Sequence, residues 1–68
     1  MSISYEKLWK KIEESGMTKT EVIRNSGITT NAMARMGKGE EVKITVLAKL
    51  SKMFNCRLDD LVDVDIEE

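Results

Sequence analysis

The chain has 68 residues, of which 41% are hydrophobic and 34% charged, with no proline, no histidine and a formal net charge of −1. This length corresponds to one domain, residues 1–68, near the lower limit for a core without disulfides or metal, and the residue usage favours an all-α fold. Because histidine is absent and Cys56 is the single cysteine, the sequence excludes an internal disulfide, ordinary zinc sites and nucleophile–base pairs, so we expect no enzyme, metal or cofactor.

The first predicted element is an amphipathic helix over residues 5 to about 15, which the hydroxyl of Ser4 can cap. Lysines and glutamates occupy its polar side, and Gly16 ends it. Its apolar side chains recur at the i, i+3, i+4, i+7 spacing of a helix face: Tyr5, Leu8, Trp9 and Ile12. We therefore expect this helix to pack on the core, with Trp9 in the core or at its edge.

Residues 18–36, TKTEVIRNSGITTNAMARM, are typical of two short helices joined by a tight turn. Thr18 and Glu21 have the spacing of a capping box at the start of the first helix. Gly27 suits the positive φ that often follows a helix end, and Thr29 or Thr30 can cap a second helix over residues 30–36. The segment is a helix-turn-helix candidate.

The two faces of this candidate motif differ in chemistry. Its inner seam consists of apolar residues: Val22, Ile28, Met33 and Met36. Its outer face consists of side-chain types that can read base edges in a major groove: Thr29, Thr30, Asn31, Ala34 and Arg35. The polar face taken alone is also compatible with ordinary first-turn capping residues.

The next segment is predicted to be a loop followed by a helix. Gly37 and Gly39 flank Lys38, and we interpret them as a loop that lets Lys38 approach a DNA phosphate, since no strand precedes them as a nucleotide-binding loop would need. A fourth helix follows, ended by Asn55, with an apolar stripe interrupted by Ser51: Ile44, Leu47, Leu50 and Phe54. A short fifth helix is expected to cover the base of the core with Leu58, Leu61 and Val62, and Cys56 is expected to be buried beside Phe54 and Leu58.

The C-terminal tail combines strand spacing with acidity. Residues 62–67 alternate apolar and acidic side chains, which is the period of a strand. The tail, about residues 63–68, is therefore expected to fray, to pair with residues 2–5, or to pair with its twin in a dimer. The last ten residues carry six carboxylates and no cation, whereas residues 18–39 carry four cations and one carboxylate. This segregation fits a nucleic-acid face backed by an acidic end.

Nearly the whole chain, residues 5–62, resembles the helix-turn-helix domains of the phage lambda Cro and repressor type, also called XRE-like, which are compact five-helix transcriptional regulators. The segments that carry the resemblance are TKTEVIRNSGITTNAMARMGKG and VLAKLSKMFNCRLDDLV. Two positions depart from the family pattern: Ile23 stands where alanine is usual, and Ser26 where an apolar residue is common.

The resemblance implies sequence-specific binding of double-stranded DNA, as a repressor, with the second motif helix in the major groove. It assigns base contacts to Thr30, Asn31, Ala34 and Arg35. It assigns phosphate contacts to Thr29, which would also cap the helix, and to Lys19, which stands where the family usually has a glutamine. It further implies a homodimer on a palindromic operator.

The competing hypothesis is a protein-interaction module on the same fold without DNA activity, which the low overall charge and the acidic tail favour. Under either hypothesis we expect a cytoplasmic protein, because the sequence shows neither a signal-peptide pattern nor an apolar run long enough to span a membrane. No small-molecule ligand is predicted, since no part of the chain is left over for a ligand domain.

Overall fold

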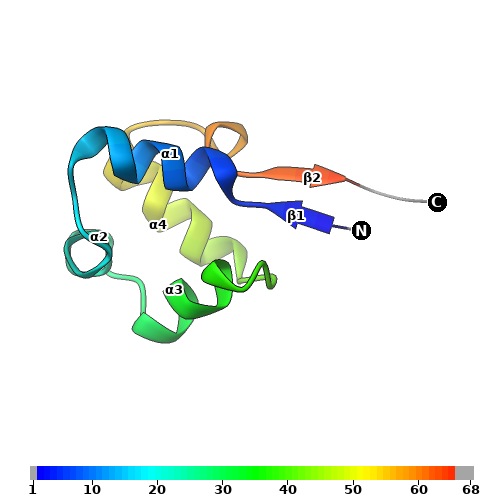
Figure 1. Cartoon of the computed structure of the whole chain (residues 1–68), viewed down its shortest axis with the longest axis horizontal. Coiled ribbons are helices and arrows are strands. Elements are labelled where there is room, and N and C mark those ends of the chain that lie inside the picture. Colours follow the sequence, from blue (N-terminus) through cyan, green and yellow to red (C-terminus); the bar gives the residue numbers. More distant parts are fainter. Residues whose placement is uncertain (1, 66–68) are drawn as a thin grey trace.

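The structure is a computed structural model that describes residues 2–65 (Figure 1). Over these residues, four α-helices are followed by one 3₁₀ turn, and a short antiparallel sheet joins the two ends of the chain. The fold is therefore mostly helical, as predicted, with a two-stranded sheet added. In chain order the elements are β1 (Ser2–Ser4), α1 (Glu6–Ser15), α2 (Lys19–Ser26), α3 (Thr30–Gly37), α4 (Ile44–Phe54), η1 (Leu58–Asp60) and β2 (Asp63–Asp65).

Helix α1 begins at Glu6, one residue later than the predicted start at Tyr5. Tyr5 is its N-cap and makes no side-chain cap hydrogen bond, so the prediction that Ser4 caps this helix is wrong. Ser4 lies in β1, where pairing with β2 holds its backbone extended, although its Oγ still accepts a long 3.4 Å hydrogen bond from the Glu6 amide. Gly16 ends α1 at φ 72°, as predicted.

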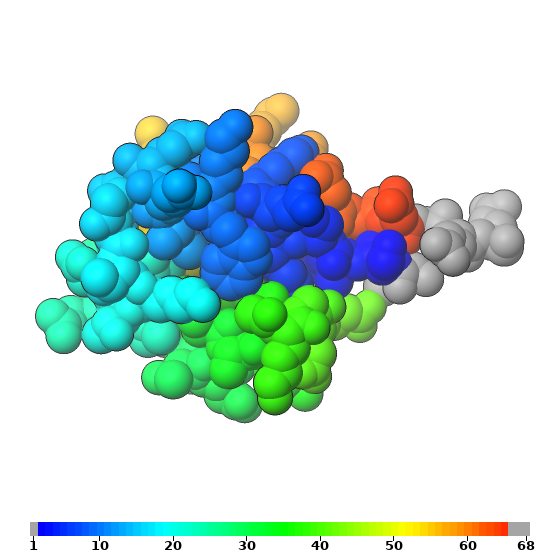
Figure 2. Space-filling model, viewed as in Figure 1, coloured from blue at the N-terminus to red at the C-terminus, as the bar shows by residue number. Residues whose placement is uncertain are grey.

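The core lies between α1 and the other three helices. The predicted stripe of α1 faces it, with Tyr5, Leu8 and Ile12 buried and Trp9 half-buried at its edge. All four residues of the predicted inner seam of α2 and α3 are buried in the same cluster. The remaining buried members are Leu47, Leu50 and Leu61. Figure 2 shows the segment of α3 packed along the lower side of α1.

Helix α4 has the predicted bounds but not all of the predicted apolar face. Leu47 and Leu50 are buried, and Asn55 ends the helix in the left-handed region at φ 52°. Ile44, in contrast, is 62% exposed, because it is the first residue of the helix and lies where the covering elements end. Cys56 is only partly buried, although it packs against the core.

The predicted fifth helix is a single 3₁₀ turn, η1, so the five-helix count is wrong. The turn places Leu61 in the core with no exposed surface, and the Arg57 amide donates a 3.2 Å hydrogen bond to Asp60 Oδ2 at its start. A longer helix is prevented because the chain becomes extended at β2 only three residues after η1 ends.

Residues 63–65, the described part of the C-terminal tail, pair with residues 2–4 of the same chain, which was one of the three alternatives. Strand β2 runs antiparallel to β1, with Ile3 opposite Val64. Lys7 ties this sheet to α1: its Nζ lies 3.0 Å from Asp63 Oδ1 and donates a 2.9 Å hydrogen bond to the Asp59 carbonyl. Ile66, which belongs to the predicted alternation, lies outside the described residues. Among residues 2–65, no helix is both long and apolar enough to cross a membrane.

Candidate nucleic-acid interface

The turn between α2 and α3 is held by hydroxyl groups and one glycine. The predicted capping box forms at the start of α2: the Glu21 amide donates to Thr18 Oγ1 at 3.2 Å, and the Thr18 amide donates to Glu21 Oε1 at 3.1 Å. Gly27 follows α2 at φ 82°, where a side chain would be strained. Thr29 caps α3 by accepting a 3.0 Å hydrogen bond from the Ala32 amide. The two helices are thus fixed locally at both of their facing ends.

The two residues that depart from the family pattern are accommodated in different ways. The hydroxyl of Ser26 donates a 2.6 Å hydrogen bond to the Val22 carbonyl, and its Oγ accepts a 3.4 Å bond from the Ile28 amide. A serine can therefore stabilise the turn where an apolar residue would pack. Ile23 is half-buried and packs against the core cluster, so its larger side chain is directed along the core edge.

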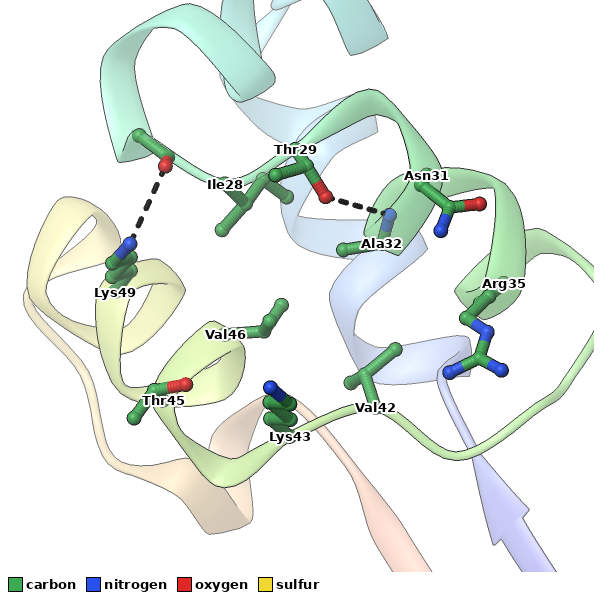
Figure 3. A pocket seen from close by; sticks show the side chains of 11 residues that line it. Ile28, Thr29, Asn31, Ala32, Arg35, Val42, Lys43, Thr45, Val46 and Lys49 are labelled. Carbon is green, nitrogen blue, oxygen red and sulfur yellow. Dashed lines mark hydrogen bonds between the residues drawn. The ribbon is translucent and has the colours of Figure 1, made fainter.

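The predicted reading face is exposed and continuous along α3. Thr30, Asn31, Ala34 and Arg35 all lie in this helix, and all four are exposed. Asn31 and Arg35 are one helical turn apart on the same side, and Figure 3 shows both side chains extending from that side of α3. The structure therefore brings the four residues together as one surface, here called the reading face.

The three predicted phosphate ligands lie at the ends of the two motif helices. Lys19 is the first residue of α2 and is exposed, with its Nζ 5.4 Å from the centre of the Trp9 ring. This cation–π contact holds the lysine stem in place while leaving its N–H donors free. Lys38 is exposed at the C-terminal cap of α3. Thr29 uses its oxygen as the cap acceptor, so its O–H remains able to donate to an anion.

A hollow of about 350 Å³ beside the reading face reveals residues that the sequence did not suggest (Figure 3). It lies between the α2–α3 turn, α3 and the start of α4, and Asn31 and Arg35 form one side of it. The opposite side carries Lys43, Thr45 and Lys49, of which Lys49 Nζ lies 3.5 Å from the Gly27 carbonyl. In the sequence, Lys43 and Lys49 were signalled only by the net charge of +2 over residues 40–58, and Thr45 had no signal.

The charge around this hollow is positive. The described residues that line it include Arg35, Lys43 and Lys49 and no carboxylate. Ile28, Val42 and Val46 are the main apolar residues of its lining. Such an arrangement attracts anions, and phosphate oxygens are the anions that accompany base edges in a duplex.

The comparisons with known proteins agree with this geometry. The family model of the Cro/C1-type HTH DNA-binding domain matches residues 7–66. The crystal structure of the transcriptional regulator VanUg, Form II, is similar to this chain with a TM-score of 0.85 and 34% sequence identity, over 91% of this chain and 83% of that chain. No curated protein matches the sequence. Because the family model spans most of the 68 residues, the chain belongs to the family of Cro/C1-type helix-turn-helix DNA-binding domains.

Proposed function

We propose that this protein is a transcriptional regulator that binds double-stranded DNA in a sequence-specific way and acts as a repressor, with α3 in the major groove. The observation that carries the proposal is the exposed reading face on α3, whose Asn31 and Arg35 line the same hollow as Lys43 and Lys49. A major groove about 12 Å wide admits one helix of this kind.

The reading face offers a specific chemical code. Asn31 can form two hydrogen bonds with an adenine, Arg35 can form two with a guanine, and Ala34 can pack on a thymine methyl group. Thr30 can donate to or accept from either kind of base edge. Each bidentate pair discriminates against a wrong base by about 1–3 kcal/mol, so Asn31 and Arg35 together would define a short half-site.

The phosphate contacts fix the register of α3 without reading sequence. Thr29 and Lys19 would bind the backbone on the α2 side, and Lys38 would bind it beyond the C-terminal end of α3. Lys43 would extend this set, because it is the N-cap of α4 and lines the hollow beside the reading face. These donors would hold the DNA backbone and so keep α3 in register with the bases.

One α3 helix reads too few bases to select an operator. Helix-turn-helix proteins solve this by binding as dimers to half-sites one helical turn apart, about 34–36 Å, so that the operator is palindromic. We accordingly propose a homodimer on a palindromic operator.

The decisive experiment is selection of bound duplexes from a random DNA pool by the full chain. We expect an enriched palindrome whose half-sites contain an adenine and a guanine at neighbouring positions. A pool that yields binding without any enriched sequence would contradict sequence-specific reading, and a pool that yields no binding would favour the protein-interaction module.

A further inference from the structure

Trp9 and Lys19 form a contact between α1 and α2 at the edge of the core. Lys19 is the first residue of α2, and its Nζ lies over the Trp9 ring, 5.4 Å from the ring centre. Trp9 is half-buried and packs against the core cluster, whereas Lys19 is exposed. The core therefore holds the ring in place, and the contact restricts the longer and more flexible side chain of the lysine.

A second aromatic ring lies beside Trp9 on the same helix. The ring centroids of Tyr5 and Trp9 are 6.4 Å apart and the ring planes are tilted by 54°, which is a favourable geometry for an aromatic pair. The Tyr5 hydroxyl donates a 2.6 Å hydrogen bond to the Glu40 carbonyl, and the Glu40 amide donates a 2.9 Å bond to the Arg35 carbonyl. These contacts link the Trp9 ring, through α1, to the C-terminal part of α3.

The position of Lys19 is unfavourable for a cation within its own helix. The macrodipole places partial positive charge at a helix N-terminus, so a lysine in the first turn is repelled. The face of an indole ring carries partial negative charge and offsets part of this repulsion. Among residues 2–65, the one ion pair joins Lys7 and Asp63, so no described carboxylate neutralises Lys19. A bound anion would therefore stabilise this lysine further.

We propose that Trp9 is a positioning residue for DNA binding, whose ring holds the ammonium group of Lys19 where it binds a phosphate; the inference rests on the proposed function. A lysine side chain loses rotamer freedom when it binds a phosphate. The ring contact removes part of that freedom before DNA binds, so the phosphate contact costs less entropy. Both partners can be bound at once, because the ring interacts with the charge of the ammonium group while its N–H bonds are donated to phosphate oxygens.

The place of Lys19 in α2 favours a lysine that stays on the ring in the complex. A phosphate is favoured at a helix N-terminus by the backbone amides and the macrodipole. Since Lys19 begins α2, its ammonium group over Trp9 lies within one side-chain length of that end of the helix. A lysine that had to leave the ring to reach a phosphate would give the opposite effect, because Trp9 would then weaken DNA binding.

The test is a double-mutant cycle, measured by titrating the full chain with the operator selected from the random pool. We expect Trp9→Leu to weaken binding by about two- to fivefold in the wild-type background. In the Lys19→Ala background it should have almost no further effect, because the lysine that the ring positions is absent. Lys38→Ala is the matched control background: it removes another proposed phosphate ligand, so there the loss from Trp9→Leu should remain complete.

A second variant and a spectroscopic measurement support the cycle. Trp9→Phe keeps an apolar ring with a weaker attraction for cations, so it should give a smaller loss with the same dependence on Lys19, even if Trp9→Leu fails to fold. Thermal melting of each variant without DNA shows whether the fold is kept. In NMR spectra, the indole ring should shift the Lys19 side-chain protons upfield. This shift should vanish in Trp9→Phe and Trp9→Leu to the extent that the affinity falls, and it should persist in the DNA complex.

Equal losses from Trp9→Leu with and without Lys19 would show that Trp9 serves only the core, and would overturn the inference. Unchanged or stronger binding by Trp9→Leu would also overturn it, as would an upfield shift that disappears when DNA binds, since the lysine would then act away from the ring. In each of these cases the wild type still binds its operator, so the proposed function stands. A wild type that binds no duplex would instead overturn both.

Discussion

Single hydroxyl groups fix the ends of α2 and the start of α3. Thr18, Ser26 and Thr29 each make a hydrogen bond with a backbone group within four residues. Such local chemistry is readable from sequence, so the capping box and the Thr29 cap could be predicted. Lys43 and Lys49 could not, because they reach the reading face only through the packing of α4 against the α2–α3 turn. A sequence shows which residues are neighbours in the chain, whereas these cations are neighbours in space.

Arg35 is the residue on which base selection should depend most. We expect Arg35→Ala to weaken binding to the selected operator by about 1–3 kcal/mol and to relax preference at one position of each half-site. The reason is the loss of a bidentate contact to guanine. Titrations against the operator and against duplexes substituted at each position measure this. Equal weakening for all sequences would instead make Arg35 a phosphate ligand.

Lys19 and Lys38 should affect binding in the opposite way. Lys19→Ala and Lys38→Ala are each expected to lower the slope of log affinity against log salt by about one per subunit, because each neutralises one phosphate. The order of preference among bases should remain unchanged. Lys10→Ala is a suitable control, since Lys10 is an exposed lysine of α1 outside the proposed contacts. A slope that does not change for Lys19→Ala or Lys38→Ala would remove that lysine from the interface.

Tyr5 should make stability depend on pH in the alkaline range. Its hydroxyl donates a 2.6 Å hydrogen bond to the Glu40 carbonyl, which ties α1 to the loop after α3. Burial raises the pKa of this hydroxyl above its usual value, and the Glu41 carboxylate adds to the rise. A raised pKa in the folded state gives stability that is complete below the unfolded pKa of about 10 and is lost as pH rises through the folded pKa.

We therefore expect the wild type to lose melting temperature above about pH 10, and Tyr5→Phe to lose less over the same range. At neutral pH, Tyr5→Phe should cost about 0.5–1.5 kcal/mol for the missing hydrogen bond. The variant will keep some alkaline dependence, because the Asp63 carboxylate also raises the pKa of Lys7. Absorbance of tyrosinate reports the titration directly, since Tyr5 is the single tyrosine. A Tyr5 that titrates at its ordinary pKa would contradict this account.

Helix α4 shows how far an apolar pattern predicts an element. The spacing of its leucines gave the helix and its bounds, because burial of one face is what a 3.6-residue period reports. The pattern did not reveal that Ile44 is exposed, since the first turn of a helix can extend past the elements that cover the rest. The apolar spacing of Leu58 and Leu61 likewise suggested a helix. The structure has a single 3₁₀ turn there, which places Leu61 in the core with fewer residues.

The contrast between Leu50 and Ile44 gives a stability test within one helix. Leu50 has no exposed surface, so Leu50→Ala should lower the free energy of unfolding by about 2–5 kcal/mol through lost burial and a cavity. A domain of this size has little stability to spare, and the variant should be largely unfolded near body temperature. Ile44→Ala is the control and should change the monomer by much less. Urea denaturation measures both, and equal losses would contradict the orientation of α4.

The whole molecule separates charge along its length. The sheet carries Asp63 and Asp65 at one end of the fold, while the cations of the proposed interface lie on α2, on α3 and between the end of α3 and the middle of α4 (Figure 1). The net charge of −1 therefore hides two regions of opposite sign. The segregation could be predicted from the sequence, but which strand held the acidic tail could not, because residues 2–5 and a second copy offered equivalent partners.

A substitution at Asp65 tests whether the acidic sheet lies far from bound DNA. It is exposed in β2 opposite Ser2, so Asp65→Asn should keep the sheet and remove one carboxylate. If the sheet lies far from bound DNA, the variant should bind the operator within about twofold of the wild type at physiological salt, where charges more than about 8 Å apart are largely screened. At low salt the screening length grows to about 30 Å, and affinity should rise. Binding titrations at both ionic strengths measure this, and a large gain at physiological salt would place β2 beside the DNA backbone.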